Sequence, residues 1–151
     1  AAAPAKMQIL MANSAGYGFL CQVGDLATKT RQGKDFMTVP EGARAFAPVA
    51  VGEASRVAAL SSDARLLVFA IDEVPARPNG GVGVQLIGLP EGATLAGVAV
   101  SDGRGLAVSG VRRKNRAVAT LTAAQLAEHE GKRAQRGKLC DIGFRPDRIG
   151  A

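Results

Sequence analysis

The chain has 151 residues, of which 47% are apolar and 4% are aromatic, and it carries a formal charge of +6. This length and apolar content are sufficient for one domain with a hydrophobic core, so the composition excludes a disordered segment. Because aromatic residues are scarce, we expect a core of Val, Leu, Ile and Ala. The 19 Gly and 7 Pro predict short strands joined by tight turns.

The positive charge lies in one half of the chain. Residues 1–75 hold seven basic and seven acidic side chains, whereas residues 76–151 hold twelve basic and six acidic ones. A one-sided basic excess indicates a polyanionic partner, either nucleic acid or a membrane surface. No apolar run approaches the roughly 18 residues of a membrane span. Composition alone does not choose between nucleic acid and a membrane surface, and the expectation of no membrane partner rests on the family resemblance given below.

The ends and the cysteines indicate the context of the chain. The start "AAAPAK" lacks an initiator Met and the apolar core of a signal peptide, so we expect residues 1–5 to be a disordered leftover and the chain to be a piece of a longer one. Cys21 and Cys140 have no CxxC spacing. This pattern predicts two reduced, largely buried thiols in a cytoplasmic protein.

Within a single domain over residues 6–151, the predicted strands follow a repeated order. The first unit covers residues 6–55 and begins with "ILMANSAG" (9–16), which is a strand with a small-residue turn. After it come a second strand, a basic stretch, a third strand and "VPEGA" (39–43). The second unit (56–93) repeats this order from "VAALSSDA" (57–64) to "LPEGA" (89–93). A strand, a small-residue turn and a strand are typical of a β-hairpin. The two PEGA copies lie 50 residues apart.

The third unit (94–151) is an altered copy. We expect "TLAGVAVSDGRGLAVSG" (94–110) to be another strand, turn and strand, with its turn at "SDG", and "RAVATL" (116–121) to be an extra strand. Residues 122–130 predict one short helix, and "GKRAQRGKLCDIGF" (131–144) resembles "TRQGKDFMTV" of the first unit. Units of this length with several short strands are typical of propeller blades. The predicted fold is all-β and propeller-like, with about three blades that form an open array or part of a larger ring.

Three stretches carry a resemblance to a known family. They are "GYGFLCQVGDLATKTRQGKDFMTVPEGA", "LLVFAIDEVPARPNGGVGVQLIGLP" and "LAEHEGKRAQRGKL", and together they resemble the C-terminal domain of the bacterial topoisomerase IV A subunit. The next nearest family is its paralogue, the A subunit of DNA gyrase. Gyrase carries a Gln-Arg-Arg-Gly-Gly-Lys-Gly box, of which "RQGK" (31–34) and "KRAQRGK" (132–138) are partial echoes. The missing box favours topoisomerase IV, although an upstream blade could hold it.

The resemblance implies a β-pinwheel, a ring of four-stranded blades that exchange strands with their neighbours and bend DNA around a basic rim. It implies a domain with no catalysis of its own and no cofactor, in a cytoplasmic, nucleoid-associated type II topoisomerase. The implied partners are double-stranded DNA, the remainder of the A polypeptide and, through it, the ATPase B subunit in a heterotetramer. The parent enzyme would use ATP to change supercoiling and to decatenate chromosomes for segregation.

Basic side chains are the candidate DNA-binding residues, because long cations on loops reach phosphates without reading sequence. Residues 112–138 contain eight basic and only two acidic side chains. Fewer basic residues occupy the matching loops of the first two units. The twelve predicted residues are Lys29, Arg31, Lys34, Arg77, Arg112, Arg113, Lys114, Arg116, Lys132, Arg133, Arg136 and Lys138. Without the resemblance, the same charges are equally compatible with an ordinary solvated surface that binds nothing. The alternative function for the chain is a propeller-like protein-interaction scaffold with a basic docking face.

No catalytic or metal-binding constellation stands out in the sequence. Tyr17, in "SAGYGF", has no metal-binding carboxylates or arginine beside it and predicts a packing or turn residue rather than a cleavage tyrosine. His129 is the single histidine, and "AEHEG" supplies no second imidazole or thiol at metal-ligand spacing. We expect it to be an exposed residue at the end of the helix.

Overall fold

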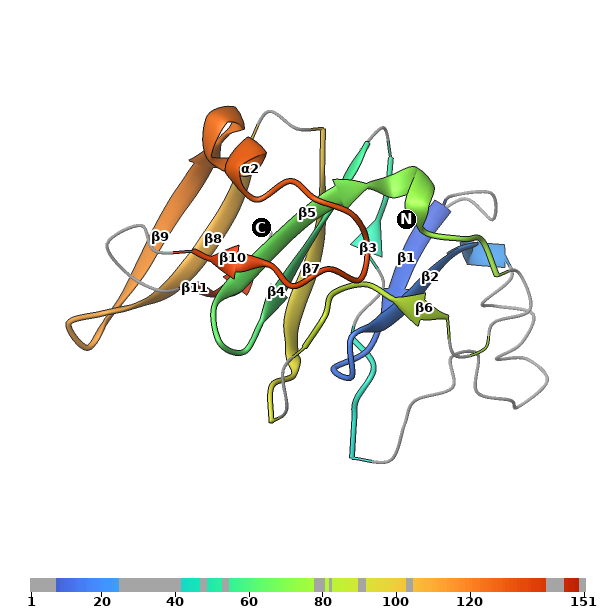
Figure 1. Ribbon diagram of the computed structural model, residues 1–151, viewed down its shortest axis with the longest axis horizontal. Helices are drawn as coiled ribbons and strands as arrows, with labels where there is room; N and C mark the ends of the chain where they lie inside the picture. Colours follow the sequence, from blue (N-terminus) through green and yellow to red (C-terminus); the bar gives the residue numbers. More distant parts are fainter. Residues whose placement is uncertain are drawn as a thin grey trace.

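The computed structural model describes residues 8–24, 42–46, 49–52, 55–77, 81, 83–89, 92–102, 105–140 and 146–149. These residues form three antiparallel sheets, which follow one another along the longest axis of the molecule (Figure 1). The all-β, propeller-like fold with a short helix is therefore confirmed. No helix among the described residues is long and apolar enough to cross a membrane.

The first sheet has the strand order β3-β1-β2-β6. Strands β1 (Gln8–Ala12) and β2 (Tyr17–Gln22) form the predicted hairpin. Strand β3 (Val49–Ala50) pairs with β1, and β6 (Val84–Gln85), from much later in the chain, pairs with β2.

The second sheet repeats this plan with the order β10-β5-β4-β7. Strands β4 (Arg56–Ser61) and β5 (Arg65–Ala70) form the hairpin, and the 3-10 helix η1 (Ile71–Glu73) follows it. Strand β7 (Leu95–Ser101) pairs with β4, as β3 pairs with β1, and β10 (Lys138–Leu139) pairs with β5, as β6 pairs with β2. The first sheet thus receives β6 from the second unit, and the second sheet receives β7 and β10 from the third unit, which agrees with the strand exchange between neighbours that the resemblance implies.

The third sheet has the order β11-β8-β9 in the described part of the chain. Its long hairpin consists of β8 (Gly105–Arg112) and β9 (Asn115–Thr122), and β11 (Pro146–Ile149) pairs with β8. Helix α2 (Ala123–Glu128) follows β9 and starts with a capping box between Thr122 and Gln125. The turns of all three hairpins lie on the lower side of the molecule in Figure 1.

The predicted hairpin at residues 94–110 is wrong. Strand β7 belongs to the second sheet and β8 to the third, so the chain at "SDG" passes from one sheet to the next. The third hairpin turn is instead Arg113–Lys114. The error arose because the sequence pattern shows only that a turn separates two strands, and does not show which strands pair. The partner of β7 is β4, about 40 residues away.

Aliphatic side chains fill the spaces between the sheets, as the composition predicted. One buried cluster joins the first two sheets and includes Leu10, Leu20, Val57 and Phe69, and a second joins the second and third sheets. Cys21 and Cys140 are both buried free thiols, which confirms that expectation. Each inner sheet face therefore depends on a neighbouring sheet for its burial, as in other repeat architectures.

Candidate nucleic-acid interface

The turn of the β8–β9 hairpin carries two exposed basic residues. Arg113 and Lys114 have φ angles of 49° and 69°, so both lie in the left-handed region, and both side chains are exposed. Two left-handed residues in a two-residue loop are characteristic of the type I′ turn, whose twist matches that of the flanking strands. The side chain of Arg112 lies outside the described residues. The hairpin projects at one end of the molecule (Figure 1), where two cations can reach a polyanion.

Arg116 lies next to this turn but its charge is already engaged. Its guanidinium makes a short, two-point ion pair with Asp147 of β11, and it also donates to Ser109 Oγ at 3.1 Å. The hydrogen bonds from Arg116 hold the pKa of Asp147 below its usual value, and the same contact raises the pKa of Arg116. Arg116 therefore joins β9 to β11 and adds little net positive charge to the surface.

The stretch from the end of α2 to the first residue of β10 holds the second basic group. Lys132, Arg136 and Lys138 are exposed, and Lys138 pairs with Leu66 through its backbone. Arg133 is half-buried, and its guanidinium donates to Gln85 O at 2.8 Å. The chain thus uses Arg133 to attach the third unit to β6 of the first sheet.

Two further groups complete the predicted set. Arg77 is exposed, and its backbone N–H donates to Leu20 O at 2.7 Å beside β2. Lys29, Arg31 and Lys34 lie outside the described residues. The structure thus places Arg77 and the Lys132 group on equivalent segments of successive units, whereas Arg113 and Lys114 lie on a hairpin turn.

Sequence reasoning did not select two exposed arginines, Arg44 and Arg148. The guanidinium of Arg44 lies 5.9 Å from the ring centroid of Phe46, within reach of a cation–π contact. Arg148 lies on β11 opposite Ser109. Isolated cations of this kind give no clustering signal, which is why the charge pattern did not find them.

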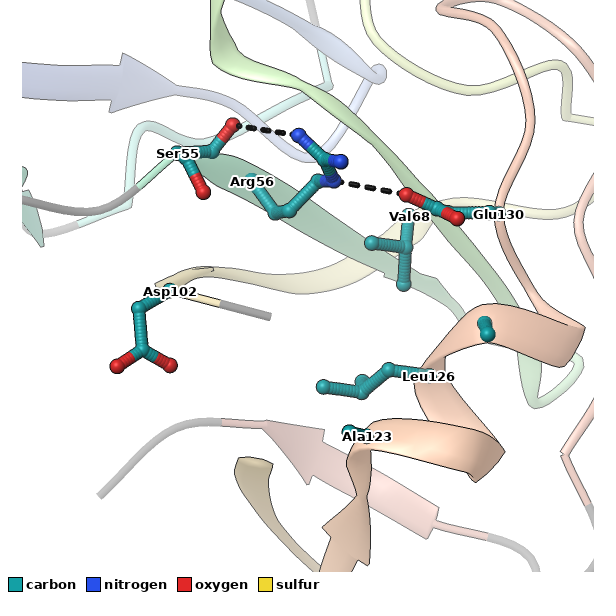
Figure 2. Close-up of a pocket in the computed structure, with 8 residues that line it drawn as sticks. Ser55, Arg56, Val68, Asp102, Ala123, Leu126 and Glu130 are labelled. Atoms are coloured by element: carbon teal, nitrogen blue, oxygen red, sulfur yellow. Dashed lines mark hydrogen bonds and ion pairs between the residues drawn. The ribbon is translucent and has the colours of Figure 1, made fainter. Parts of the chain in front are cut away.

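A cavity of about 310 Å³ lies between the second sheet and α2 (Figure 2). Its apolar side is formed by Val68, Leu126 and two alanines of the helix. On its polar side, Arg56 Nε donates to Glu130 Oε1 at 2.7 Å. This ion pair connects β4 with the segment after α2, so these charges join two units. In the described segments, no three His, Cys, Asp or Glu side chains gather to hold a metal ion.

His129 differs from the expectation of an exposed residue. It caps the C-terminus of α2 as predicted, but its ring is half-buried and Nδ1 lies 3.2 Å from Leu66 O. Burial lowers the pKa of the imidazole below its ordinary value of 6.5. The neutral ring therefore packs against the second sheet, because the chain after the helix turns back onto β5.

The chain matches known proteins over most of its length. The family model described as "DNA gyrase C-terminal domain, beta-propeller" matches residues 8–49 and 56–102, more than half of the chain. The A subunit of DNA topoisomerase 4 from Escherichia coli K12 is 35% identical over 91 residues, which are 60% of this chain and 12% of that protein. The corresponding protein of Neisseria gonorrhoeae is 32% identical over 143 residues, which are 91% of this chain and 18% of that protein. The chain thus spans less than a fifth of the length of these relatives.

Solved structures agree with these matches. The structure titled "Structure of the E. coli ParC C-terminal domain" superposes with a TM-score of 0.81 and 30% identity, over 97% of this chain and 61% of that one. A DNA gyrase A C-terminal domain gives a TM-score of 0.71 at 16% identity, over 95% of this chain and 47% of that one, and supports the fold alone. The resemblance inferred from the sequence is confirmed.

Proposed function

The chain belongs to the family of DNA gyrase C-terminal β-propeller domains, and on this premise we propose that it binds and bends duplex DNA as a non-catalytic part of a topoisomerase IV A subunit. The observation that carries the proposal is the pair of exposed cations, Arg113 and Lys114, at the tip of the longest hairpin. Lys132, Arg136 and Lys138 extend the basic surface from another unit. Such side chains suit phosphate contacts, which position DNA without reading its sequence.

The wider setting is part of the same proposal. The domain would act in the bacterial cytoplasm at the nucleoid, attached to the remainder of the A polypeptide and through it to the ATPase B subunit. By bending duplex DNA, it would favour the crossings that an ATP-dependent type II topoisomerase passes during decatenation. The names of the relatives support this setting, since each is an A subunit of topoisomerase 4.

The test measures binding to a linear duplex by fluorescence anisotropy over a range of salt concentrations. Each phosphate contact contributes about −0.9 to the slope of log K against log salt. We expect Arg113→Glu with Lys114→Glu to weaken binding and to reduce the magnitude of this slope by about two. The matched control is Arg44→Glu with Arg148→Glu, which changes the net charge equally at exposed positions outside the predicted set. Salt-independent binding, or an equal effect of both double variants, would contradict the proposal.

The alternative is a scaffold that docks an acidic protein on the same basic face. The observation that favours it is the exposure of Val111 (55%) and Val118 (76%) on the β8–β9 hairpin, because exposed apolar residues beside charges are common at protein interfaces. The same glutamate variant separates the two functions. A scaffold keeps whatever weak DNA affinity it has, whereas a DNA-binding domain loses it.

A further inference from the structure

Residues 131–136 form a turn that is held by its own hydrogen bonds. Lys132 N donates to Gln135 Oε1 at 2.9 Å, and Gln135 N donates to Lys132 O at 3.2 Å. Ala134, inside the turn, has a φ of 71°, in the left-handed region that alanine rarely adopts. Such conformations persist where the surrounding contacts over-determine the backbone. The 131–136 turn carries two exposed cations, Lys132 and Arg136.

The second unit holds this turn from outside. Ala134 N donates to Leu86 O at 3.1 Å, and Gly88 N donates to Gln135 O at 2.8 Å. A Cβ on Gly88 would lie 3.0 Å from Ala134 O, so the two backbones are in close contact. In Figure 1 the segment after α2 runs toward β6 and then turns back to β10. The arrangement of the cations in this turn therefore depends on a segment about 50 residues earlier in the chain.

Glu73, the last residue of η1, binds the main chain of the same turn. Its Oε1 accepts a hydrogen bond from Arg133 N at 3.0 Å, whereas the guanidinium of Arg133 donates to Gln85 O. A hydrogen bond to an ionised acceptor is about twice as strong as one between neutral groups. The carboxylate thus acts on the shape of the turn as well as on the charge of the surface.

These two actions of Glu73 affect DNA affinity in opposite directions. Its negative charge repels phosphates, but salt screens this repulsion over a distance of about 10 Å at 0.1 M ionic strength. Its hydrogen bond orders the turn before DNA arrives, so less conformational entropy is lost when Lys132 and Arg136 contact phosphates. The ordering affects every residue of the turn, whereas the repulsion comes from one solvated charge, so we expect the ordering to be the larger effect.

We propose that Glu73 is a positioning residue for DNA binding, whose carboxylate holds the 131–136 turn so that Lys132 and Arg136 are presented in one fixed arrangement. This role rests on the DNA-binding function proposed above. An acidic side chain then increases the affinity for a polyanion, although its charge alone would decrease it. The opposite signs make the two explanations easy to separate.

The direction of the change in affinity tests this role. Glu73→Ala removes a charge and the acceptor of Arg133 N, whereas Asp72→Ala removes the charge of the preceding, exposed residue of η1. We expect Glu73→Ala to raise the dissociation constant for a linear duplex about threefold or more, measured by fluorescence anisotropy at about 0.1 M salt. Asp72→Ala should lower the constant slightly. Equal or tighter binding by Glu73→Ala than by the parent chain would overturn the proposal.

The conservative variant Glu73→Gln provides the rescue. Its amide oxygen can accept from Arg133 N, and the negative charge is gone. We therefore expect its dissociation constant to equal or fall below that of the parent chain. Weakening as large as that of Glu73→Ala would show that the hydrogen bond to the turn is not what matters, and would contradict the proposal.

Amide hydrogen exchange without DNA separates this role from the proposed function. In Glu73→Ala, the N–H of Ala134 keeps its acceptor, Leu86 O, yet should exchange about tenfold faster because the turn opens more often. The amides of β4, at the centre of the second sheet, should be unchanged, which verifies the fold. Unchanged exchange at Ala134 would overturn the positioning role alone. A parent chain without salt-dependent DNA binding would overturn the proposed function and this role with it.

Discussion

At the scale of single residues, conformational cost and charge coincide at the β8–β9 turn. Arg113 and Lys114 adopt left-handed φ values that glycine and asparagine tolerate far better than long side chains. A turn that retains two cations in this conformation gives up stability, and such strain is typical of functional positions.

Replacing this turn should therefore separate stability from DNA binding. We expect Arg113→Asn with Lys114→Gly to raise the free energy of unfolding by about 1–2 kcal/mol, because Asn-Gly is the preferred type I′ sequence. The same variant should lose DNA affinity with a salt slope that is smaller by about two. Urea unfolding and fluorescence anisotropy measure the two effects. Unchanged or reduced stability would show that the turn is not strained.

Gly137 gives a second prediction at this scale. It is buried, its φ is not left-handed, and an added Cβ would lie 2.6 Å from the backbone of Leu66. We expect Gly137→Ala to lower the free energy of unfolding by about 1–3 kcal/mol through overpacking. Gly105→Ala is the control, since its nearest neighbour would be 3.4 Å away, and it should change stability by less than about 0.5 kcal/mol. Equal effects of the two substitutions would refute the steric explanation.

At the scale of elements, helix α2 and the segment after it join the second and third sheets. His129 ends the helix, its carbonyl accepts from Val68 N, and its ring packs against Leu66. The Arg56–Glu130 ion pair lies one residue further along. The junction therefore depends on a neutral imidazole at its centre.

The depressed pKa of His129 predicts a pH dependence. In the unfolded chain, His129 has the ordinary imidazole pKa of 6.5 and takes up a proton as the pH falls through that value, whereas in the folded chain its lowered pKa resists protonation. The free energy of unfolding should therefore fall as the pH drops from 7 through 6.5. His129→Asn should flatten this slope, because asparagine keeps a donor and does not titrate. The loss of stability caused by Asp147, whose pKa is depressed, begins only near its ordinary value of 3.8 and should persist in both proteins. Urea titrations across this pH range test the prediction, and parallel curves above pH 4.5 would contradict it.

At the scale of the whole molecule, the basic groups lie on different units of a stacked array. The β8–β9 hairpin lies at one end and β10 lies nearer the middle (Figure 1). A duplex that contacts both groups has to follow the array, and bending DNA costs less where its steps are flexible.

We therefore expect tighter binding to a duplex rich in TA and CA steps than to an A-tract of equal length and charge. Energy transfer between dyes at the ends of the duplex should rise on binding, because bending brings the ends together. The Arg113→Glu, Lys114→Glu variant should reduce both effects. Equal affinity for the two duplexes, with no change in end-to-end distance, would exclude bending.

Much of the architecture was predictable because the repeat is written into local sequence. The hairpins at β1–β2 and β4–β5, the helix at residues 123–128 and the aliphatic core all follow from nearby residues. The placement of β7 was not predictable, since its partner β4 is distant in sequence and its own pattern fits either sheet. The site was predictable only as a set of charges, and its twelve residues remain a prediction.

The sequence by itself determined the all-β class, the repeat, the asymmetry of charge and the family, because each depends on composition or on the order of short motifs. Tertiary structure decided which cations keep their charge available. Arg116 is paired with Asp147 and Arg133 is bound to Gln85 O, whereas Arg113 and Lys114 remain exposed. The tertiary structure also decided that β6 pairs with β2 of the first sheet and β10 with β5 of the second. The outer edge of β9 has no strand partner among the described residues. These outcomes depend on hydrogen bonds and ion pairs between distant segments, which local periodicity does not encode.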